Sequence, residues 1–241
     1  MNNQNMPQDL QLLLTNSFLG MKNHPQKHLI PLQRDIIYKT FFSKLQSNSL
    51  LAWISFLSAK KTLQILQNAI GSKRSTPTEL SDIAEQALTR IIDTENDIFR
   101  NTLDRAYHAS GHSWGCNPQK FPLEADFAGA ALYRTLQTID GKDPFWLLRC
   151  NGHKGYKVHF NGRTKYVCLD EHLTDDMFFE PIGAVEDASS LAAKAFSFTV
   201  AIETDELDIV PQYDFNKRQE FWEWWLIEAI PIAWEQANQY R

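Results

Sequence analysis

The stretch YHASGHSWGCNP at residues 107–118 places two histidines and a cysteine four residues apart, at His108, His112 and Cys116. Imidazole nitrogen and thiolate sulfur are preferred zinc ligands, and a thiol beside an imidazole can also act as a nucleophile with its base. Residues four apart lie on one face of an α-helix, so the spacing alone brings these side chains near one another. The two chemistries to consider are therefore a metal site and a cysteine nucleophile.

A metal site would need more than this helix face. On a regular helix His108 and Cys116 would lie about 12 Å apart along the axis, too far to share one ion. The helix would have to break at a glycine between them, and Cys150 and His153, in a C-x-x-H spacing, could then add ligands. A metal-dependent hydrolase that uses His108, His112 and Cys116 is therefore the alternative hypothesis.

A structural interpretation accounts for the same stretch. Gly111 and Gly115 can end a helix, Trp114 can pack, and Asn117-Pro118 can turn the chain. The sequence contains no pair of C-x-x-C motifs, no H-E-x-x-H motif, and no glycine-rich phosphate loop or nucleophile elbow. We therefore expect a protein that is not an enzyme, with no catalytic residue, metal or cofactor.

The composition is that of a globular protein, since 43% of its 241 residues are hydrophobic and 22% are charged. Its three cysteines, Cys116, Cys150 and Cys168, are too few for a disulfide framework, which favours a reducing compartment. The N-terminus has no basic start typical of a secretion signal, and the longest apolar stretch, Leu50–Leu57, is too short to cross a bilayer. These features predict a cytoplasmic protein that does not enter a membrane.

Most of the chain shows the apolar periodicity of helices, with prolines and glycines at their ends. Pro31 fits a first helical position, and Thr76 with Glu79 would form a capping box around Pro77. The small residues at 125–131 predict close approach to a neighbouring helix. The predicted helices are Asp9–Leu19, 31–46, Ser49–Ile70, 77–91, Glu95–Ser110, Leu123–Ile139, Ser189–Ile202 and Asn216–Gln239.

The exception is a predicted β-hairpin near residues 155–169. Tyr156–Phe160 and Thr164–Leu169 lean towards strand, and Asn161-Gly162 between them fits a type I′ turn. We therefore expect a mostly α fold, with residues 1–241 as a single multi-helix domain and this hairpin as a small insertion. Within that domain, residues 8–75 would supply N-terminal helices.

The block RQEFWEWWLIEAIPIAW at residues 218–234 carries apolar bulk around most of a helix circumference. This pattern predicts a central core helix, with Trp225 in the core and a kink or an end of the regular helix at Pro231. An alternative is that Trp222 or Trp224 is exposed as an interface anchor, because tryptophan is enriched at binding hot spots.

Negative charge is concentrated in residues 170–214, which hold twelve acids and one base, Lys194. This region therefore carries a net charge of −11, and the rest of the chain carries +6 to give the total of −5. Such a surface would repel nucleic acid phosphates and attract a basic partner. Alternatively, the acidic surface would serve only to keep the protein in solution.

Three motifs, AYHASGHSWGC, PLEADFAGAAL and FWEWWLIEAIPIAW, resemble the fifth family of immunity proteins from bacterial polymorphic toxin systems. The resemblance covers roughly residues 80–240, within the predicted 76–241 region, and leaves the 155–169 hairpin as an addition. It implies a mostly helical cytoplasmic protein, encoded beside a toxin gene, that binds and occludes its cognate toxin domain. It carries over no catalytic residues, because inhibition by occlusion requires none.

The resemblance and the charge together predict a basic toxin domain as the partner, with a nuclease as one candidate class. A helical adaptor with no toxin partner is a further alternative, and a homodimer is compatible with the sequence. The residues expected to bind the partner are Glu203, Asp205, Glu206, Asp208 and Asp214, then Asp175 and Asp176, with Trp222 as the aromatic anchor.

Overall fold

The structure, a computed structural model, describes residues 6–45, 47–70, 77–109, 122–141, 155–160, 163–168, 187–203 and 209–240. Its first six helices are α1 (Gln8–Asn23), α2 (Pro31–Leu45), α3 (Ser49–Ile70), α4 (Pro77–Leu88), α5 (Asp97–Ala109) and α6 (Leu123–Ile139). The remaining elements are β1 (Gly155–Phe160), β2 (Arg163–Cys168), α8 (Ala188–Ser197), β3 (Phe198–Glu203), β4 (Ile209–Tyr213), α9 (Phe215–Trp224), η3 (Trp225–Ala229) and α10 (Ile230–Gln239). This arrangement confirms the predicted mostly α fold with a small β-hairpin.

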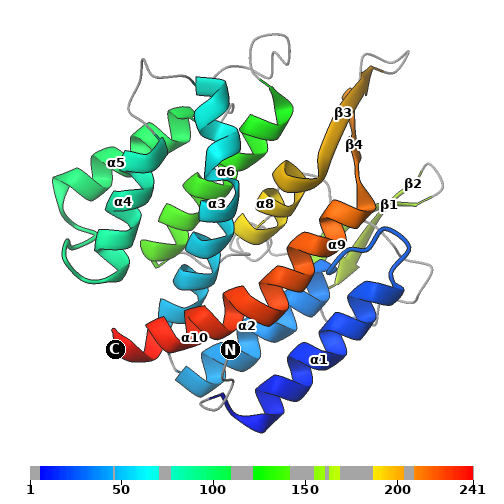
Figure 1. Ribbon diagram of the computed structural model, residues 1–241, viewed down its shortest axis with the longest axis horizontal. Coiled ribbons are helices and arrows are strands. Elements are labelled where there is room, and N and C mark those ends of the chain that lie inside the picture. Colours follow the sequence, from blue (N-terminus) through cyan, green and yellow to red (C-terminus); the bar gives the residue numbers. More distant parts are fainter. Residues whose placement is uncertain are drawn as a thin grey trace.

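Helix α3 lies at the centre of the fold, where it packs against α6 and α8 (Figure 1). The contact with α6 is close because its buried face is made of small residues such as Ala125, Ala128 and Ala131, as the sequence predicted. Helices α4 and α5 cover one side of this centre, and α1, α2 and the C-terminal helices cover another (Figure 1). Buried side chains from all these helices form one hydrophobic cluster.

The predicted helix start at Pro77 is confirmed, whereas its capping partner Thr76 lies outside the described residues. Helix α4 ends at Leu88 because Arg90 adopts a left-handed backbone conformation with φ of 60°, and the Ile91 amide bonds back to the Gln86 carbonyl at 2.8 Å. The predicted continuation of this helix to about residue 91 is therefore wrong by one turn.

The C-terminal helix is interrupted by the π-helical turn η3. The amide of Ile230 bonds to the carbonyl of Trp225, five residues back, instead of to that of Leu226. Pro231 follows at once, and its ring cannot donate to the carbonyl of Ile227 and would clash with it in a regular helix. The widened turn accommodates the proline, which confirms that Pro231 interrupts the regular helix.

The described residues contain two hairpins, whereas the sequence predicted one. Strand β1 pairs antiparallel with β2 from Gly155↔Cys168 to Phe160↔Arg163, which confirms the predicted hairpin to within a residue at each end. The second hairpin pairs β3 with β4, with an irregular register between Phe198 and Val200. The prediction of a helix over Ser189–Ile202 is therefore wrong from Phe198 onward, because the aromatic and β-branched residues that follow α8 pair with the next strand along the chain.

No helix among the described residues is long and apolar enough to cross a bilayer. The three longest, α3, α6 and α1, contain 22, 17 and 16 residues and are interrupted by polar side chains.

Candidate functional site

The structure describes only part of the histidine–cysteine stretch at residues 107–118. His108 lies near the end of α5 with 61% of its side chain exposed, and its Nε2 is 3.7 Å from a carboxylate oxygen of Asp104, one turn earlier. His112, Cys116, Cys150 and His153 lie outside the described residues. Among the residues that the structure does describe, no three His, Cys, Asp or Glu side chains come close enough to hold a metal ion.

A buried polar cluster, here called the Asp187 network, joins four helical elements. The carboxylate of Asp187 caps the N-terminus of α8 by accepting the Ser190 amide at 2.9 Å. The same carboxylate accepts the Tyr38 hydroxyl at 2.6 Å and lies 3.2 Å from Nε of Arg34, both from α2. Asp187, Arg34 and Tyr38 are all at least 97% buried, so this is an ion pair within the core.

The network continues through two serines to the C-terminal helix. The hydroxyl of Ser189 on α8 lies 3.2 Å from the Tyr38 hydroxyl and 2.9 Å from that of Ser58 on α3. The indole N–H of Trp225 donates to both serines, at 3.0 Å to Ser189 and 3.2 Å to Ser58. The Asp187 network thus links α2, α3, α8 and η3 through buried polar contacts.

The electrostatic consequence is clearest at Tyr38. Burial raises the pKa of its hydroxyl well above the usual value near 10, and the negative charge of Asp187 raises it further. Tyr38 therefore remains a neutral donor to Asp187 throughout the neutral pH range. Because an ion pair and several hydrogen bonds join side chains from different helices, the Asp187 network is a structural contact between those helices.

The expectation that Trp222 is an exposed interface anchor is wrong, because its side chain is 0% exposed. It packs edge-on against Trp225 at 5.5 Å between centroids, lies under the guanidinium of Arg34 at 5.3 Å, and donates its N–H to Nδ1 of His28 at 3.2 Å. The other interpretation of the aromatic block, a central core helix, is confirmed for Trp222 and Trp225.

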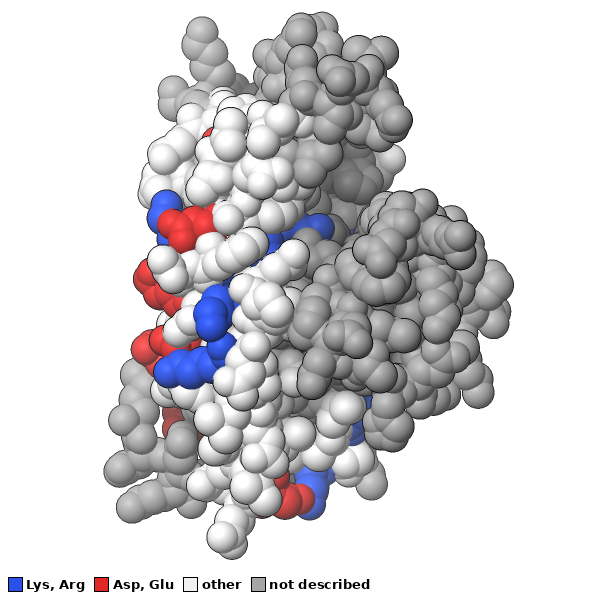
Figure 2. Space-filling view, turned by 90° about the vertical axis from the view of Figure 1, so that its right-hand side faces the viewer, with Lys and Arg blue, Asp and Glu red and all other residues white. Residues whose placement is uncertain are grey.

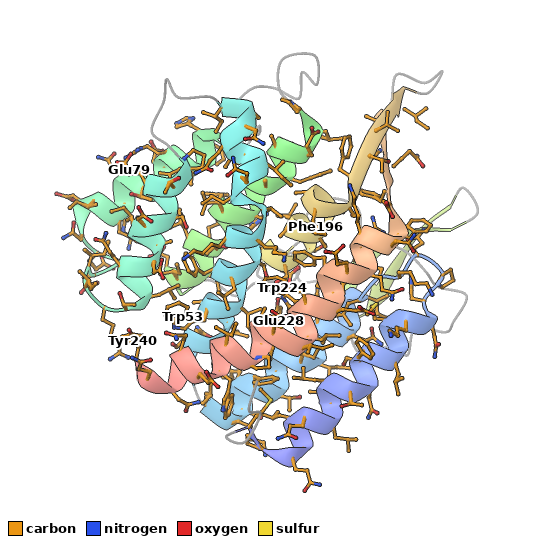
Figure 3. The ribbon with its side chains drawn as sticks, in the orientation of Figure 1. Trp53, Glu79, Phe196, Trp224, Glu228 and Tyr240 are labelled. Atoms are coloured by element: carbon orange, nitrogen blue, oxygen red, sulfur yellow. The ribbon has the colours of Figure 1, made fainter. Side chains whose placement is uncertain are left out.

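Trp224 is the tryptophan of this block that reaches the surface. It is half-buried and lies beside Phe196 of α8 (Figure 3), with Nζ of Lys61 4.8 Å from its ring centroid and 5.8 Å from that of Phe196. The amino group of Lys61 thus covers two aromatic rings from neighbouring helices.

The acids predicted to bind a partner lie in several places. Glu203 is the last residue of β3, and Asp214 follows β4, where it caps α9 by accepting the amides of Asn216 at 2.8 Å and Lys217 at 3.2 Å. Outside the described residues lie Asp205, Glu206 and Asp208, which join β3 to β4 in the chain, and Asp175 and Asp176.

The β3–β4 hairpin is directly continuous with two helices of the core. Helix α8 runs without a break into β3, and β4 leads through Asp214 into α9. The amide of Asp214 bonds to the carbonyl of Ser197 at 2.8 Å, which closes the base of the hairpin. The buried guanidinium of Arg218 lies over the ring of Tyr213 at 4.2 Å and near that of Phe215 at 5.8 Å. Figure 1 shows the hairpin extending away from the helices.

An open apolar groove of about 270 Å³ lies between α1 and the C-terminal helix. Ile227, which is 55% exposed, contributes to its wall. The groove is lined by Met6, Gln11, Leu14, Thr15, Phe18, Leu226, Ile227 and Pro231.

Charged side chains of the described residues do not separate by sign on the face shown in Figure 2, where acidic and basic groups lie beside each other. Surface ion pairs, such as Lys22–Glu223 at 3.4 Å and Lys44–Asp9 at 2.6 Å, likewise place opposite charges next to each other. Nine of the twelve acids in residues 170–214 lie outside the described residues. The predicted acidic surface therefore stays a prediction from the sequence.

A scan of the chain against protein-family models finds no match, and a search of curated proteins finds no significant relative.

Proposed function

We propose that this chain is a binding protein that neutralises a bacterial toxin domain by covering it, as the resemblance to the fifth immunity-protein family implies. It would act in the cytoplasm and perform no chemistry of its own. The partner would be a basic toxin domain encoded beside it, and a nuclease fits because nucleases carry cationic surfaces for phosphate binding.

The observation that carries the proposal is the concentration of acids in the sequence of the β3–β4 hairpin and its connecting segment. Residues 198–214 contain five acids and no base, and they form the β3–β4 hairpin with its connecting segment and the cap of α9. A hairpin fixed between two core helices can present negative charge to a partner without rearrangement of the core. Such charge speeds diffusional encounter with a basic surface and favours it over other surfaces.

The buried polar groups support the same function. Arg34, Tyr38, Asp187 and Ser189 bond to one another inside the core. They stabilise the base of the hairpin, since Asp187 caps α8 and Ser189 lies in its first turn, and α8 leads into β3. The polar chemistry of the core thus serves to position a binding surface.

The test is to express the product of the adjacent reading frame in a bacterial host, alone and together with this chain. We expect growth arrest with the neighbour alone, rescue on co-expression, and co-purification of the two products as a complex. A harmless neighbour, or a toxic one that this chain fails to neutralise, would contradict the proposal. Stoichiometric zinc or iron in the purified chain would instead favour the hydrolase hypothesis.

A further inference from the structure

We propose that Val200 and Ile202 on β3 form the apolar centre of a docking surface for a protein whose cationic residues surround an apolar patch. This inference rests on the proposed function, and it identifies the contact surface and the chemistry of the partner surface.

Val200 and Ile202 are exposed by 52% and 50%, respectively. Residues two apart in a strand point to the same face of the sheet, so these two β-branched side chains form one continuous apolar strip. Their Cα partners on β4 are Gln212 and Val210. An exposed apolar strip on a projecting two-stranded sheet offers a contact that a partner protein can cover.

The strip is held rigidly at its base. Besides the Asp214–Ser197 bond, the hydroxyl of Thr199 donates to the carbonyl of Gln212 at 3.0 Å, between the two strands. Beyond the strands, the buried Arg218 packs on Tyr213. A surface that is already ordered loses little conformational entropy when it binds, which favours tight binding through a small contact.

Charge identifies the occupant as a basic protein surface. The segment from Phe198 to Asp214 carries five acids and no base. Two copies of this chain that met through their hairpins would bring two segments of like charge together, which disfavours a homodimer at this surface. The same charge disfavours nucleic acid and anionic lipid. A protein surface with an apolar patch surrounded by cationic residues would complement both the apolar strip of β3 and the negative charge of residues 198–214.

The experiment uses the product of the adjacent reading frame as the probe, with dissociation followed by surface plasmon resonance. The double variant Val200→Thr/Ile202→Thr removes apolar surface and keeps β-branched residues that suit a strand. We expect its complex to dissociate at least tenfold faster than that of the parent, because loss of contacts within an interface acts mainly on dissociation. Protection of residues 198–202 from hydrogen exchange in the parent complex is the second expected result and does not depend on how the variant folds.

The control is Ile98→Thr, because Ile98 is 54% exposed and belongs to α5, a helix on the opposite side of the fold from the β3–β4 hairpin (Figure 1). Unchanged dissociation for the control and faster dissociation for the double variant support the docking surface. Parent-like dissociation of the double variant overturns the docking surface and leaves the proposed function intact. Loss of binding only in Ile227→Thr has the same consequence, because it would move the contact to the groove beside α1. A parent that dimerises through the strip also overturns the inference, and a parent that forms no complex overturns both proposals.

Discussion

The hydroxyl of Tyr38 lies 2.6 Å from the carboxylate of Asp187, although 149 residues separate them in the sequence. This contact joins α2 to the N-cap residue of α8, the helix that continues into the β3–β4 hairpin. Both side chains are almost fully buried, and Arg34 completes the ion pair at 3.2 Å. The hairpin is therefore positioned by a charged contact within the core.

The first prediction concerns the charge of Asp187. Asp187→Asn keeps the shape of the side chain and its cap on α8, but leaves the buried guanidinium of Arg34 without its counter-ion. Removal of one partner from a buried ion pair costs about 3–5 kcal/mol. We expect a loss of this size in the free energy of unfolding, measured by urea denaturation.

Asp214→Asn is the matched control, because Asp214 also caps a helix but is partly exposed and has no ion pair among the described residues. Its free energy of unfolding should stay within about 0.5 kcal/mol of the parent value, since asparagine and aspartate cap helices about equally well. Equal stability of the two variants would show that the charge of Asp187 is not needed for folding.

The second prediction concerns alkaline pH. Because the pKa of Tyr38 is raised in the folded protein, the folded chain keeps this proton at pH values where the unfolded chain has lost it. The contribution of Tyr38 to stability is therefore complete below the unfolded pKa near 10 and decreases as the pH rises towards the folded value, by about 1.4 kcal/mol per pH unit.

Unfolding curves of the parent and of Tyr38→Phe between pH 9 and about pH 11 test this prediction. We expect the free energy of unfolding of the parent to fall more steeply, because the phenylalanine variant has no proton to retain. Tyr133→Phe is the comparison, since partial burial raises the pKa of Tyr133 as well and its removal should flatten the curve less. A parallel decline in parent and Tyr38→Phe would be inconsistent with the raised pKa.

The third prediction compares neighbouring tryptophans. Trp225 is 0% exposed and its N–H bonds to Ser58 and Ser189, whereas Trp224 is only half-buried. Trp225→Ala should lower the free energy of unfolding by about 3–5 kcal/mol, as large-to-small core substitutions do, and Trp224→Ala should lower it by clearly less. Thermal and urea denaturation of both variants provide the measurement, and a Trp225→Ala protein as heat-resistant as the parent would place Trp225 outside the core.

Helices with strong local signals were predictable from the sequence. Ser49–Ile70 and Leu123–Ile139 were predicted with the bounds that the structure shows, because apolar periodicity and small residues fix both their extent and their buried face. The starts at Pro31 and Pro77 followed from the fixed φ of proline.

The second hairpin was missed, although a local signal was present. Phe198, Val200 and Ile202 alternate with smaller residues at the period of a strand, but they follow the alanine-rich α8 without a glycine or proline to end it. Pairing with Ile209–Tyr213 across a short connection decides the outcome, and the apolar periodicity of either segment alone does not reveal this pairing.

The Asp187 network and the burial of Trp222 depend on contacts between distant segments. In the sequence Asp187 is one of twelve acids in an acidic region, and its place before Ala188 gives only the weak signal of a helix cap. Its burial requires Arg34 and Tyr38 from α2. In the same way, only the packing of Arg34 and His28 reveals that Trp222 faces inward and Trp224 outward.

The last prediction concerns the acids between β3 and β4. Replacement of Asp205, Glu206 and Asp208 by alanine removes three negative charges from the segment that joins the two strands. If the partner is basic, its association should slow by about tenfold at low salt and become less dependent on salt, because steering by opposite charge raises association rates and is screened by ions. Stopped-flow association with the product of the adjacent reading frame, at several salt concentrations, measures both effects.

The matched control removes the same number of charges from α4 and α5, on the other side of the fold from the hairpin (Figure 1), through alanine at Asp82, Asp97 and Asp104. Both triple variants change the net charge of −5 to −2, so a long-range effect of net charge alone would slow both equally. A larger effect at the hairpin, with unfolding temperatures close to the parent value, assigns the steering charge to the β3–β4 connection. Parent-like association and salt dependence of the hairpin variant would remove these acids from the interface.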